Sequence, residues 1–300
     1  MAHQLIPEAE EILDKEFPVL DSGFVRLVDY LGGDQRIVQA ARVSYGAGTK
    51  SYRQDKGLIN YLLRNEHTSP FEQVILTFHT KMPIFVARQW VRHRTARLNE
   101  ISGRYSVMEQ EFYLPAPEQI AFQSSDNKQG RSSEPMSSED AATVREELAR
   151  GYAEAYRVYQ GLLDRGVARE LARVVLPLSL YTEWYWQIDL HNLFHFLKLR
   201  VDPHAQYEIR AYGEVMLAIT RRVAPLAVEA FEEHIRGGVG YSATEHEALR
   251  AALLPGDGGT ATGERSVPGI EGIRAAAVEA GLEGKALERF LRKVETGLSS

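Results

Sequence analysis

The sequence predicts an α+β fold, in which long helices flank a central antiparallel or mixed sheet. Three segments, residues 23–31, 74–79 and 181–188, alternate apolar and polar side chains or are rich in aromatic ones, as β-strands are. Two others, residues 139–164 and 203–235, are long stretches of helical pattern. Together these elements predict one main domain built around a sheet.

Shorter helices are expected between these elements. Asp34 and Asp189 are expected N-caps, and Pro83 is expected to open a helix that ends near Arg92, because proline is tolerated at the first helical position. Residues 123–140 are rich in Ser, Asn, Asp and Gly, which predicts an exposed, mobile loop. The expected bounds are 34–41, 56–64, 83–92, 168–176 and 189–199, and Ser138 is the expected N-cap of the helix over 139–164.

Composition along the chain predicts three regions. Residues 1–17 are a polar, acidic extension, and residues 18–236 are the main body. Residues 237–300 form a C-terminal appendage, in which the Gly-, Thr- and Pro-rich stretch 255–263 is typical of a linker. One or two small helices are expected within residues 273–296.

The overall composition argues against several classes of function. A formal charge of -6 over 300 residues does not suit a protein that coats nucleic acid, which needs a surplus of Lys and Arg. No apolar run approaches the ~20 residues of a membrane helix, and the N-terminus resembles no signal or transit peptide, so a cytoplasmic location is expected. The chain has 0 cysteines, which excludes disulfides, thiolate metal sites and cysteine nucleophiles. An enzyme of this composition must use acid–base and electrostatic means, or a cofactor.

Residues 92–105 carry the densest chemistry of the chain. They read Arg-His-Arg-Thr-Ala-Arg-Leu-Asn-Glu-Ile-Ser-Gly-Arg-Tyr. Arginine forks hold phosphate groups, and the side chains of Asn99 and Glu100 can orient hydroxyl or ring N–H groups. Because the basic residues are concentrated locally, a small anionic ligand is favoured over a polymer. We interpret the segment as a nucleotide site.

This segment resembles the fingerprint of the flavin-dependent thymidylate synthases, which is Arg-His-Arg followed by Asn-Glu, Ser and Arg-Tyr. The resemblance continues in consistent order over about residues 22–236. Arg97 stands where the family usually carries Ser and cannot act as a hydroxyl nucleophile. The appendage after residue 236 is a second departure from the family core. Further matches are Ala41-Arg42-Val43-Ser44, His67-Thr68-Ser69-Pro70-Phe71-Glu72, Arg88-Gln89-Trp90, Ala172-Arg173-Val174-Val175-Leu176-Pro177, Leu199-Arg200 and His204-Ala205-Gln206.

The resemblance implies the fold of the thymidylate synthase complementing proteins and the methylation of dUMP to dTMP. 5,10-Methylenetetrahydrofolate would supply the carbon and leave as tetrahydrofolate, and FAD reduced by NADPH would supply the reducing equivalents. No side chain would attack the pyrimidine. Arg200 would be the catalytic residue, because a fixed guanidinium stabilises negative charge on the ring. A homotetramer with active sites between subunits is also implied.

The resemblance further implies which residues bind each ligand. His67 is a candidate for the folate site, and no metal is expected. The implied dUMP site comprises Gln89, Trp90, Val91, Arg92, Glu100, Ile101, Ser102, Gly103, Arg104, Arg173 and Arg200. The implied FAD site comprises Ser69, Arg92, His93, Arg94, Glu100, Asp189, Leu190, His191 and His195.

Other interpretations stay open on the sequence alone. His191 and His195 have the spacing of a metal pair, but the motif lacks the Glu of the zinc proteases and an evident third ligand, which favours a flavin contact or a structural role. The arginine segment could belong to an RNA- or DNA-binding module. The chain could also be a flavoprotein that oxidises NADPH without methyl transfer. Trp184 and Trp186 are expected to be core or interface residues.

Overall fold

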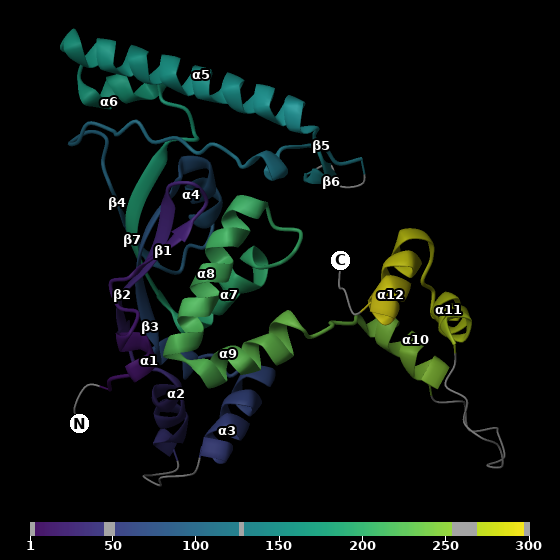
Figure 1. The fold of residues 1–300 in the computed structure, drawn as a ribbon. Coiled ribbons are helices and arrows are strands. Elements are labelled where there is room, and N and C mark those ends of the chain that lie inside the picture. Colours follow the sequence, from purple (N-terminus) through teal and green to yellow (C-terminus); the bar gives the residue numbers. More distant parts are fainter. Residues whose placement is uncertain (1–3, 45–51, 126–128, 254–268, 297–300) are drawn as a thin grey trace, which may run out of the picture. The chain divides into compact units, whose positions relative to one another are not determined.

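A computed structural model describes residues 4–44, 52–125, 129–253 and 269–296. The chain divides into two units, Met1–Phe231 and Glu232–Ser300, which are described separately below (Figure 1). The linker expected at 255–263 lies outside the described residues.

The first unit is built on a five-stranded sheet in the order β1-β2-β3-β7-β4, and every neighbouring pair is antiparallel. The three strands predicted from alternation are neighbours in the middle of this sheet. The α+β prediction with an antiparallel sheet is therefore confirmed. The strands are β1 (Glu16–Val19), β2 (Gly23–Leu31), β3 (Ile75–Pro83), β4 (Arg97–Glu100) and β7 (Tyr181–Asp189).

One face of the sheet lies against helices. Trp184 and Trp186 of β7 point to this face and are each 1% exposed, as expected for core residues. The ring of Trp90, at the end of α4 (Ile84–Trp90), lies edge-on to both, at 5.5 and 5.4 Å between centroids. Edge-to-face contacts of this kind add to the burial of large apolar rings. Tyr185 points to the opposite face and is 45% exposed, so the two-residue period of the sequence is present in the sheet.

The helices of the first unit come from all parts of its sequence. α4, α7 and α8 pack against the sheet, and α5 lies beside α6 (Figure 1). Besides α4, the helices are α1 (Pro7–Glu10), α2 (Asp34–Ala41), α3 (Tyr52–Arg64), α5 (Ser138–Asp164), α6 (Arg169–Ala172), α7 (Leu190–Arg200), α8 (Tyr207–Val223) and α9 (Pro225–Phe231).

The prediction of a single helix over residues 203–235 is wrong. α8 starts only at Tyr207, and α9 starts at Pro225 after a break at Ala224. A proline has no N–H to donate, and its ring clashes with the preceding helical turn, so the helix cannot continue through Pro225. The predicted start fails because the Asp202 side chain accepts a hydrogen bond from the backbone N–H of His204 at 2.8 Å, which forms a turn instead.

Two segments in which the sequence predicted no strand contain strands. α4 ends at Trp90 rather than near Arg92, and residues 97–100 form β4 because they pair with β7. β6 (Arg131–Pro135) lies within the predicted loop 123–140 and pairs with β5 (Ala121–Gln123), which ends where that loop was predicted to begin. Residues 126–128 lie outside the described part. β4 depends on a partner strand more than 80 residues away, which its own sequence cannot reveal. β6 pairs with a nearby segment, but its sequence, Arg-Ser-Ser-Glu-Pro, lacks the apolar alternation that predicts a strand.

The N-cap of α5 is Ser137 rather than the predicted Ser138. The Ser137 hydroxyl accepts a hydrogen bond from the backbone N–H of Asp140 at 3.1 Å. This satisfies one of the donors that the first turn of a helix leaves unpaired. The two serines are adjacent, so the residue type was predicted correctly and its position was wrong by one.

Asp34 caps a different helix from the one predicted. The N-cap of α2 is Gly33, whereas the Asp34 carboxylate accepts hydrogen bonds from the backbone N–H groups of Leu226 and Ala227 at 2.8 and 3.0 Å. These two amides belong to the first turn of α9. Burial raises the pKa of Asp34 to about 6, although both hydrogen bonds act to lower it. The residue therefore joins two segments of the first unit.

Removal of this cap is expected to destabilise the first unit. Asp34→Ala should lower the free energy of unfolding by about 1–2 kcal/mol at pH 7, because two amides of α9 lose their acceptor. Asp34→Asn keeps a side-chain acceptor and should lose less. Urea unfolding of both variants measures the effect, and equal stability of Asp34→Ala and the unmodified chain would contradict the assigned cap.

In its described residues the second unit contains a π-helical segment, Glu232–Arg236, and three α-helices, α10 (Ala243–Leu253), α11 (Ile270–Glu279) and α12 (Gly284–Thr296). The last two cover most of the predicted helical region 273–296, whereas α10 was not predicted. Its start is a capping box: the Glu245 carboxylate accepts from the Ser242 N–H at 2.8 Å, and the Ser242 hydroxyl accepts from the Glu245 N–H at 3.3 Å. The core of this unit comprises Ala248, Ile273, Ala277, Leu282, Phe290 and Leu291.

A buried ion pair joins α10 to α12. Lys293 and Glu245 are 8% and 3% exposed. The Lys293 ammonium donates to both carboxylate oxygens of Glu245, at 3.0 and 2.8 Å, and to the carbonyl of Gly240 at 3.1 Å. Burial acts to raise the pKa of Glu245, but the hydrogen bonds from Lys293 and Ser242 lower it overall. Both charges are thus compensated where they are buried.

Candidate active site

The fingerprint segment runs from the end of α4 along the edge of the sheet. After Trp90 the chain turns and enters β4, where Glu100 lies opposite Trp184 of β7. All four residues of β4 are exposed. The Glu100 carboxylate accepts a hydrogen bond from the Thr182 hydroxyl at 2.6 Å. The acidic group of the fingerprint is therefore held by a neighbouring strand rather than carried on a free loop.

Arg200, His93 and Gln89 meet in what we call the arginine–histidine centre. Arg200, the last residue of α7, donates from Nε to Nε2 of His93 at 3.1 Å and from Nη2 to the carbonyl of Gln89 at 3.0 Å. The C-terminal end of a helix favours a cation. Burial and the nearby Arg92 both lower the pKa of Arg200. The guanidinium is thus fixed in direction, partly desolvated and close to a second cation.

His93 in this centre is a neutral hydrogen-bond acceptor. Burial, the charge of Arg200 and the nearby His195 lower the pKa of His93 to about 4. Near pH 7 the ring is therefore uncharged, and because Nε2 accepts from Arg200, the ring proton belongs on Nδ1. Burial and the nearby His191 and Lys198 also lower the pKa of His195.

The lowered pKa of His93 predicts a loss of stability in acid. Between pH 6.5 and about 4 the unfolded chain binds a proton at His93 that the native chain does not bind. The free energy of unfolding should therefore fall as the pH falls through this window. His93→Gln keeps an acceptor that does not titrate. It should remove this part of the slope, on the order of 1–2 kcal/mol at a partly exposed site.

Chemical denaturation of both proteins at pH 7 and pH 4.5 measures the effect. Asp34, whose pKa is raised to about 6, contributes the opposite slope in nearly the same window, because its stabilising protonation is lost as the pH rises. The slope of the variant must therefore be compared with that of the unmodified chain. Identical slopes would mean that His93 titrates alike in both states.

A second part of the predicted site is a cavity of about 180 Å³ around Gly103, which we call the Gly103 pocket. A Cβ atom at Gly103 would lie 2.9 Å from Sδ of Met108 and 3.2 Å from Cδ of Arg173, so a side chain there would crowd this wall. The pocket combines a carboxylate and a guanidinium with an apolar floor, which suits a nucleotide-like ligand. Its lining is Ile84, Glu100, Ile101, Gly103, Met108, Arg173, Leu176, Leu180 and Thr182.

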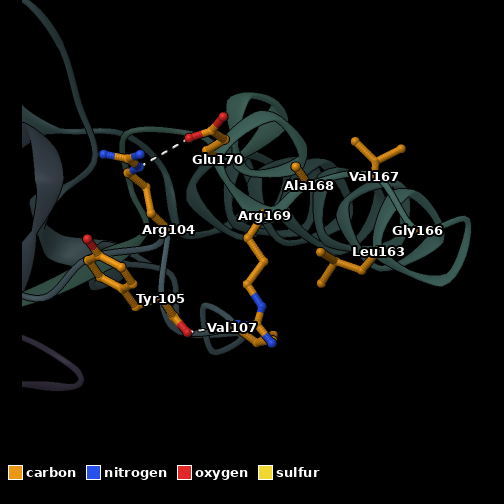
Figure 2. A pocket seen from close by; sticks show the side chains of 9 residues that line it. All are labelled: Arg104, Tyr105, Val107, Leu163, Gly166, Val167, Ala168, Arg169 and Glu170. Carbon is orange, nitrogen blue, oxygen red and sulfur yellow. Dashed lines mark hydrogen bonds and ion pairs between the residues drawn. The ribbon is translucent and has the colours of Figure 1, made fainter.

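Arg104 faces a neighbouring cavity of about 510 Å³ (Figure 2). Its Nε donates to the Glu170 carboxylate at 3.1 Å, and Arg169 donates from Nη1 to the carbonyl of Tyr105 at 2.8 Å. Figure 2 shows Arg104 reaching towards Glu170, with Tyr105 and Arg169 beside them. These contacts tie the end of the fingerprint to α6, and two basic groups line the same hollow.

The residues predicted to bind FAD gather partly at the N-terminus of α7. Asp189 caps this helix as predicted, because its carboxylate accepts from the backbone N–H of Asn192 at 2.9 Å. The rings of His191 and His195 lie 4.7 Å apart. Leu190 is fully buried, so only its main chain can meet a ligand.

Other predicted residues occupy different surroundings. Trp90 is 0% exposed, so its side chain belongs to the core and only its main chain can meet a ligand. The ring of His67 lies edge-on to Tyr61 at 5.8 Å, in the turn that precedes β3 and also contains Ser69. Ser102 accepts a hydrogen bond at its hydroxyl from the backbone N–H of Arg104, at 3.3 Å. Val91 is partly buried, while Arg92, Arg94 and Arg97 are at least partly exposed.

The sequence interpretation did not include three residues that support these predicted positions. Thr182 holds Glu100, Met108 closes the Gly103 pocket, and Glu170 pairs with Arg104. None lies in the fingerprint, and the contacts join residues as many as 82 positions apart. The alternation of β7 predicts the face of the sheet on which Thr182 lies. Its partner Glu100 could not be predicted, because the sequence does not show that β4 pairs with β7.

The described residues contain neither a metal cluster nor a membrane span. Within residues 4–44, 52–125, 129–253 and 269–296, no group of three or more His, Asp and Glu side chains is arranged to hold a metal ion. In the same ranges, no helix is both long and apolar enough to cross a membrane.

The comparisons with known proteins agree with the fingerprint. Residues 26–226 match the family described as thymidylate synthase complementing protein. The chain belongs to this family. It is 58% identical over 285 residues to the flavin-dependent thymidylate synthase of Treponema denticola, a match that covers 95% of this chain and 99% of the relative. The corresponding enzyme of Thermus thermophilus is 52% identical over 277 residues, covering 92% and 95%.

The solved structures give the same result for the fold. The UMP/dUMP methylase PolB from Streptomyces cacaoi, bound with 5-Br UMP, is similar to this chain with a TM-score of 0.67 and 36% identity. The similarity covers 73% of this chain and 97% of that one. Family membership identifies the chain as a methyltransferase of the flavin-dependent thymidylate synthase family. Because the Treponema denticola match covers 95% of the chain, it also extends into the second unit.

Proposed function

We propose that the chain methylates dUMP to dTMP. In this reaction 5,10-methylenetetrahydrofolate supplies the carbon, NADPH reduces the bound FAD, and tetrahydrofolate is released. The main support for this proposal is the arginine–histidine centre, where Arg200 is held between the neutral ring of His93 and the carbonyl of Gln89. The names of the relatives and the nucleotide bound to PolB support the choice of substrate and flavin.

The centre suits activation of a pyrimidine. Methylation of ring carbon 5 requires electron density at that carbon, and negative charge then develops on the ring nitrogen and oxygen. A guanidinium that is already oriented and desolvated stabilises this charge without reorganising. The chain has 0 cysteines, and Arg97 stands where the family usually carries Ser. We therefore assign activation to Arg200 and none to a nucleophilic side chain.

The dUMP residues form two groups, and we propose that a homotetramer joins them. Gln89 and Arg200 lie in the arginine–histidine centre, while Glu100, Gly103 and Arg173 line the Gly103 pocket. Exposed apolar side chains lie near Arg173 in the sequence: Leu171 is 64%, Val174 74% and Leu178 62% exposed, which favours a covering partner. In the proposed assembly, the Gly103 pocket of one subunit holds the phosphate end and the arginine–histidine centre of another holds the base.

The residues near α7 fit the chemistry of FAD. Arg92 and Arg94 can hold a diphosphate through guanidinium forks. His93 and His195 add ring nitrogens to the same region, and the N-terminal end of α7 favours an anion. When bound, FAD would carry the reducing equivalents from NADPH. The role of the protein is to hold it beside the nucleotide and to keep His93 uncharged. His67 and Ser69, in the adjacent turn, are the proposed folate and flavin contacts.

Absorbance and product assays on the purified protein test this function. The protein should be yellow, its flavin absorbance should bleach with NADPH in the absence of oxygen, and dUMP with methylenetetrahydrofolate should then give dTMP on chromatography. UMP is assayed in parallel because PolB is described as acting on both nucleotides. NADPH oxidation without dTMP at full flavin content would identify an oxidase instead. Salt-dependent binding of polynucleotides without binding of dUMP would identify a nucleic-acid-binding protein.

A further inference from the structure

The side chain of Gln89 is held by a chain of hydrogen bonds that ends in the interior of the protein. Its Nε2 donates to Oε1 of Gln206, which immediately precedes α8. Nε2 of Gln206 in turn donates to the Glu208 carboxylate at 2.8 Å. The sequence His204-Ala205-Gln206 matches the family, but the resemblance assigned it no role. Its glutamine connects the nucleotide site to a buried acid.

Glu208 is the fixed end of this series of hydrogen bonds. It is 3% exposed and lies in the first turn of α8, where the helix dipole favours a negative charge. Arg131 of β6 donates from Nη2 to both of its oxygens at 2.7 and 2.8 Å, and the Tyr113 hydroxyl donates at 3.0 Å. Burial acts to raise the pKa of Glu208, but the hydrogen bonds and charge of Arg131 lower it. The group is therefore a carboxylate near pH 7.

A carboxylate only accepts hydrogen bonds, and this fixes the direction of both amides. Gln206 must turn its NH2 group towards Glu208, which leaves its carbonyl oxygen for Gln89. Gln89 must then turn its own NH2 group towards Gln206. One N–H of Gln89 is thereby committed to Gln206, and the opposite end of the amide presents the carbonyl oxygen Oε1, which can accept a hydrogen bond from a ligand but not donate one.

We propose that Glu208, acting through Gln206, is a positioning residue that makes Gln89 a hydrogen-bond acceptor in the nucleotide site. This rests on the proposed function, in which Gln89 contacts dUMP. The acceptor takes an N–H of the base or a hydroxyl of the sugar, and not the phosphate, which carries no donor near pH 7 in its dianionic form. The relay of Gln89, Gln206 and Glu208 thus contributes to selecting a ligand with a donor at that point.

The test uses the flavin-loaded full-length protein and measures both dissociation of dUMP and turnover. In Gln206→Met, the methionine side chain is close in length to glutamine but makes neither hydrogen bond. Because position 206 lies outside the core, the variant should keep its fold. We expect dUMP to bind about 3- to 10-fold more weakly, with flavin content unchanged and the loss in KM for dUMP rather than in kcat. Tyr113→Phe is the matched control. It removes a hydrogen bond to the same carboxylate outside the relay and should leave dUMP binding unchanged.

A double-mutant cycle shows whether Gln206 acts through Gln89. If it does, Gln89→Met with Gln206→Met should bind dUMP no more weakly than Gln89→Met alone. Additive losses, unchanged binding in Gln206→Met, or an equal loss of flavin and dUMP would each overturn the relay. Failure of the proposed function gives a different result, because the unmodified protein would then bind dUMP without forming dTMP, or not bind it at all.

Discussion

Replacing Arg200 with alanine is expected to lower turnover by at least about 10²–10³-fold while flavin stays bound. The guanidinium is held by His93 and by the carbonyl of Gln89, so it is in place before charge develops on the base. Removal of one preorganised charge-stabilising donor from an enclosed site costs about this factor in kcat. Formation of dTMP at saturating dUMP measures the effect, and flavin absorbance shows whether the cofactor site is intact.

Two further variants make this result specific. Arg200→Lys keeps the charge but loses the planar fork, so it should recover little activity. Arg157→Ala removes an exposed arginine on α5 that pairs along its own helix with Glu154 at 2.6 Å, and it should leave turnover unchanged. Near-normal activity in Arg200→Ala would refute the assigned role, whatever the outcome for the controls.

Replacing Lys293 with methionine should have the largest effect on stability. The variant leaves the Glu245 carboxylate buried without its cation, at a cost of about 3 kcal/mol or more. A small three-helix unit has little stability to lose, so α10, α11 and α12 should open together. Hydrogen exchange of the full-length protein would detect this as loss of amide protection within residues 243–296.

The matched control for this variant is Lys285→Met. Lys285 is exposed on the same helix, so its loss should change stability by no more than about 0.5 kcal/mol. Replacing both charges, as Lys293→Met with Glu245→Gln, should recover part of the protection because no charge is left uncompensated. Normal protection in Lys293→Met would mean that the ion pair is not needed to hold the three helices together.

Elements with a strong local pattern could be predicted from the sequence. The strands over 23–31 and 181–188 and the cap at Asp189 follow from alternation and from a side chain that bonds to its own helix. The break at Pro225 also has a local signal, because a proline within a helical stretch interrupts the helix, although the predicted helix ran through it. By contrast, β4 exists only because β7 lies beside it, and Asp34 caps a helix far along the chain.

The candidate site shows the same division. Its residues could be named from the fingerprint, because residue types at fixed spacing record which chemistry is needed. Their grouping could not, since Glu100 lies with Arg173 and Thr182 while Arg200 lies with His93. The direction of the Gln89 amide depends on Glu208, whose partner Arg131 lies in the segment 123–140 that was predicted as a loop.

The pairing of distant segments also determines when the first unit can fold. The central pair of the sheet joins Ile75 to Asp189, and Asp34 bonds to an amide 193 residues further along the chain. Contacts of such wide separation form slowly, because a long loop must close before any of them stabilises the chain. A ribosome making this protein therefore exposes β2 and β3 well before β7 exists. We expect these apolar strands to need protection from aggregation during synthesis.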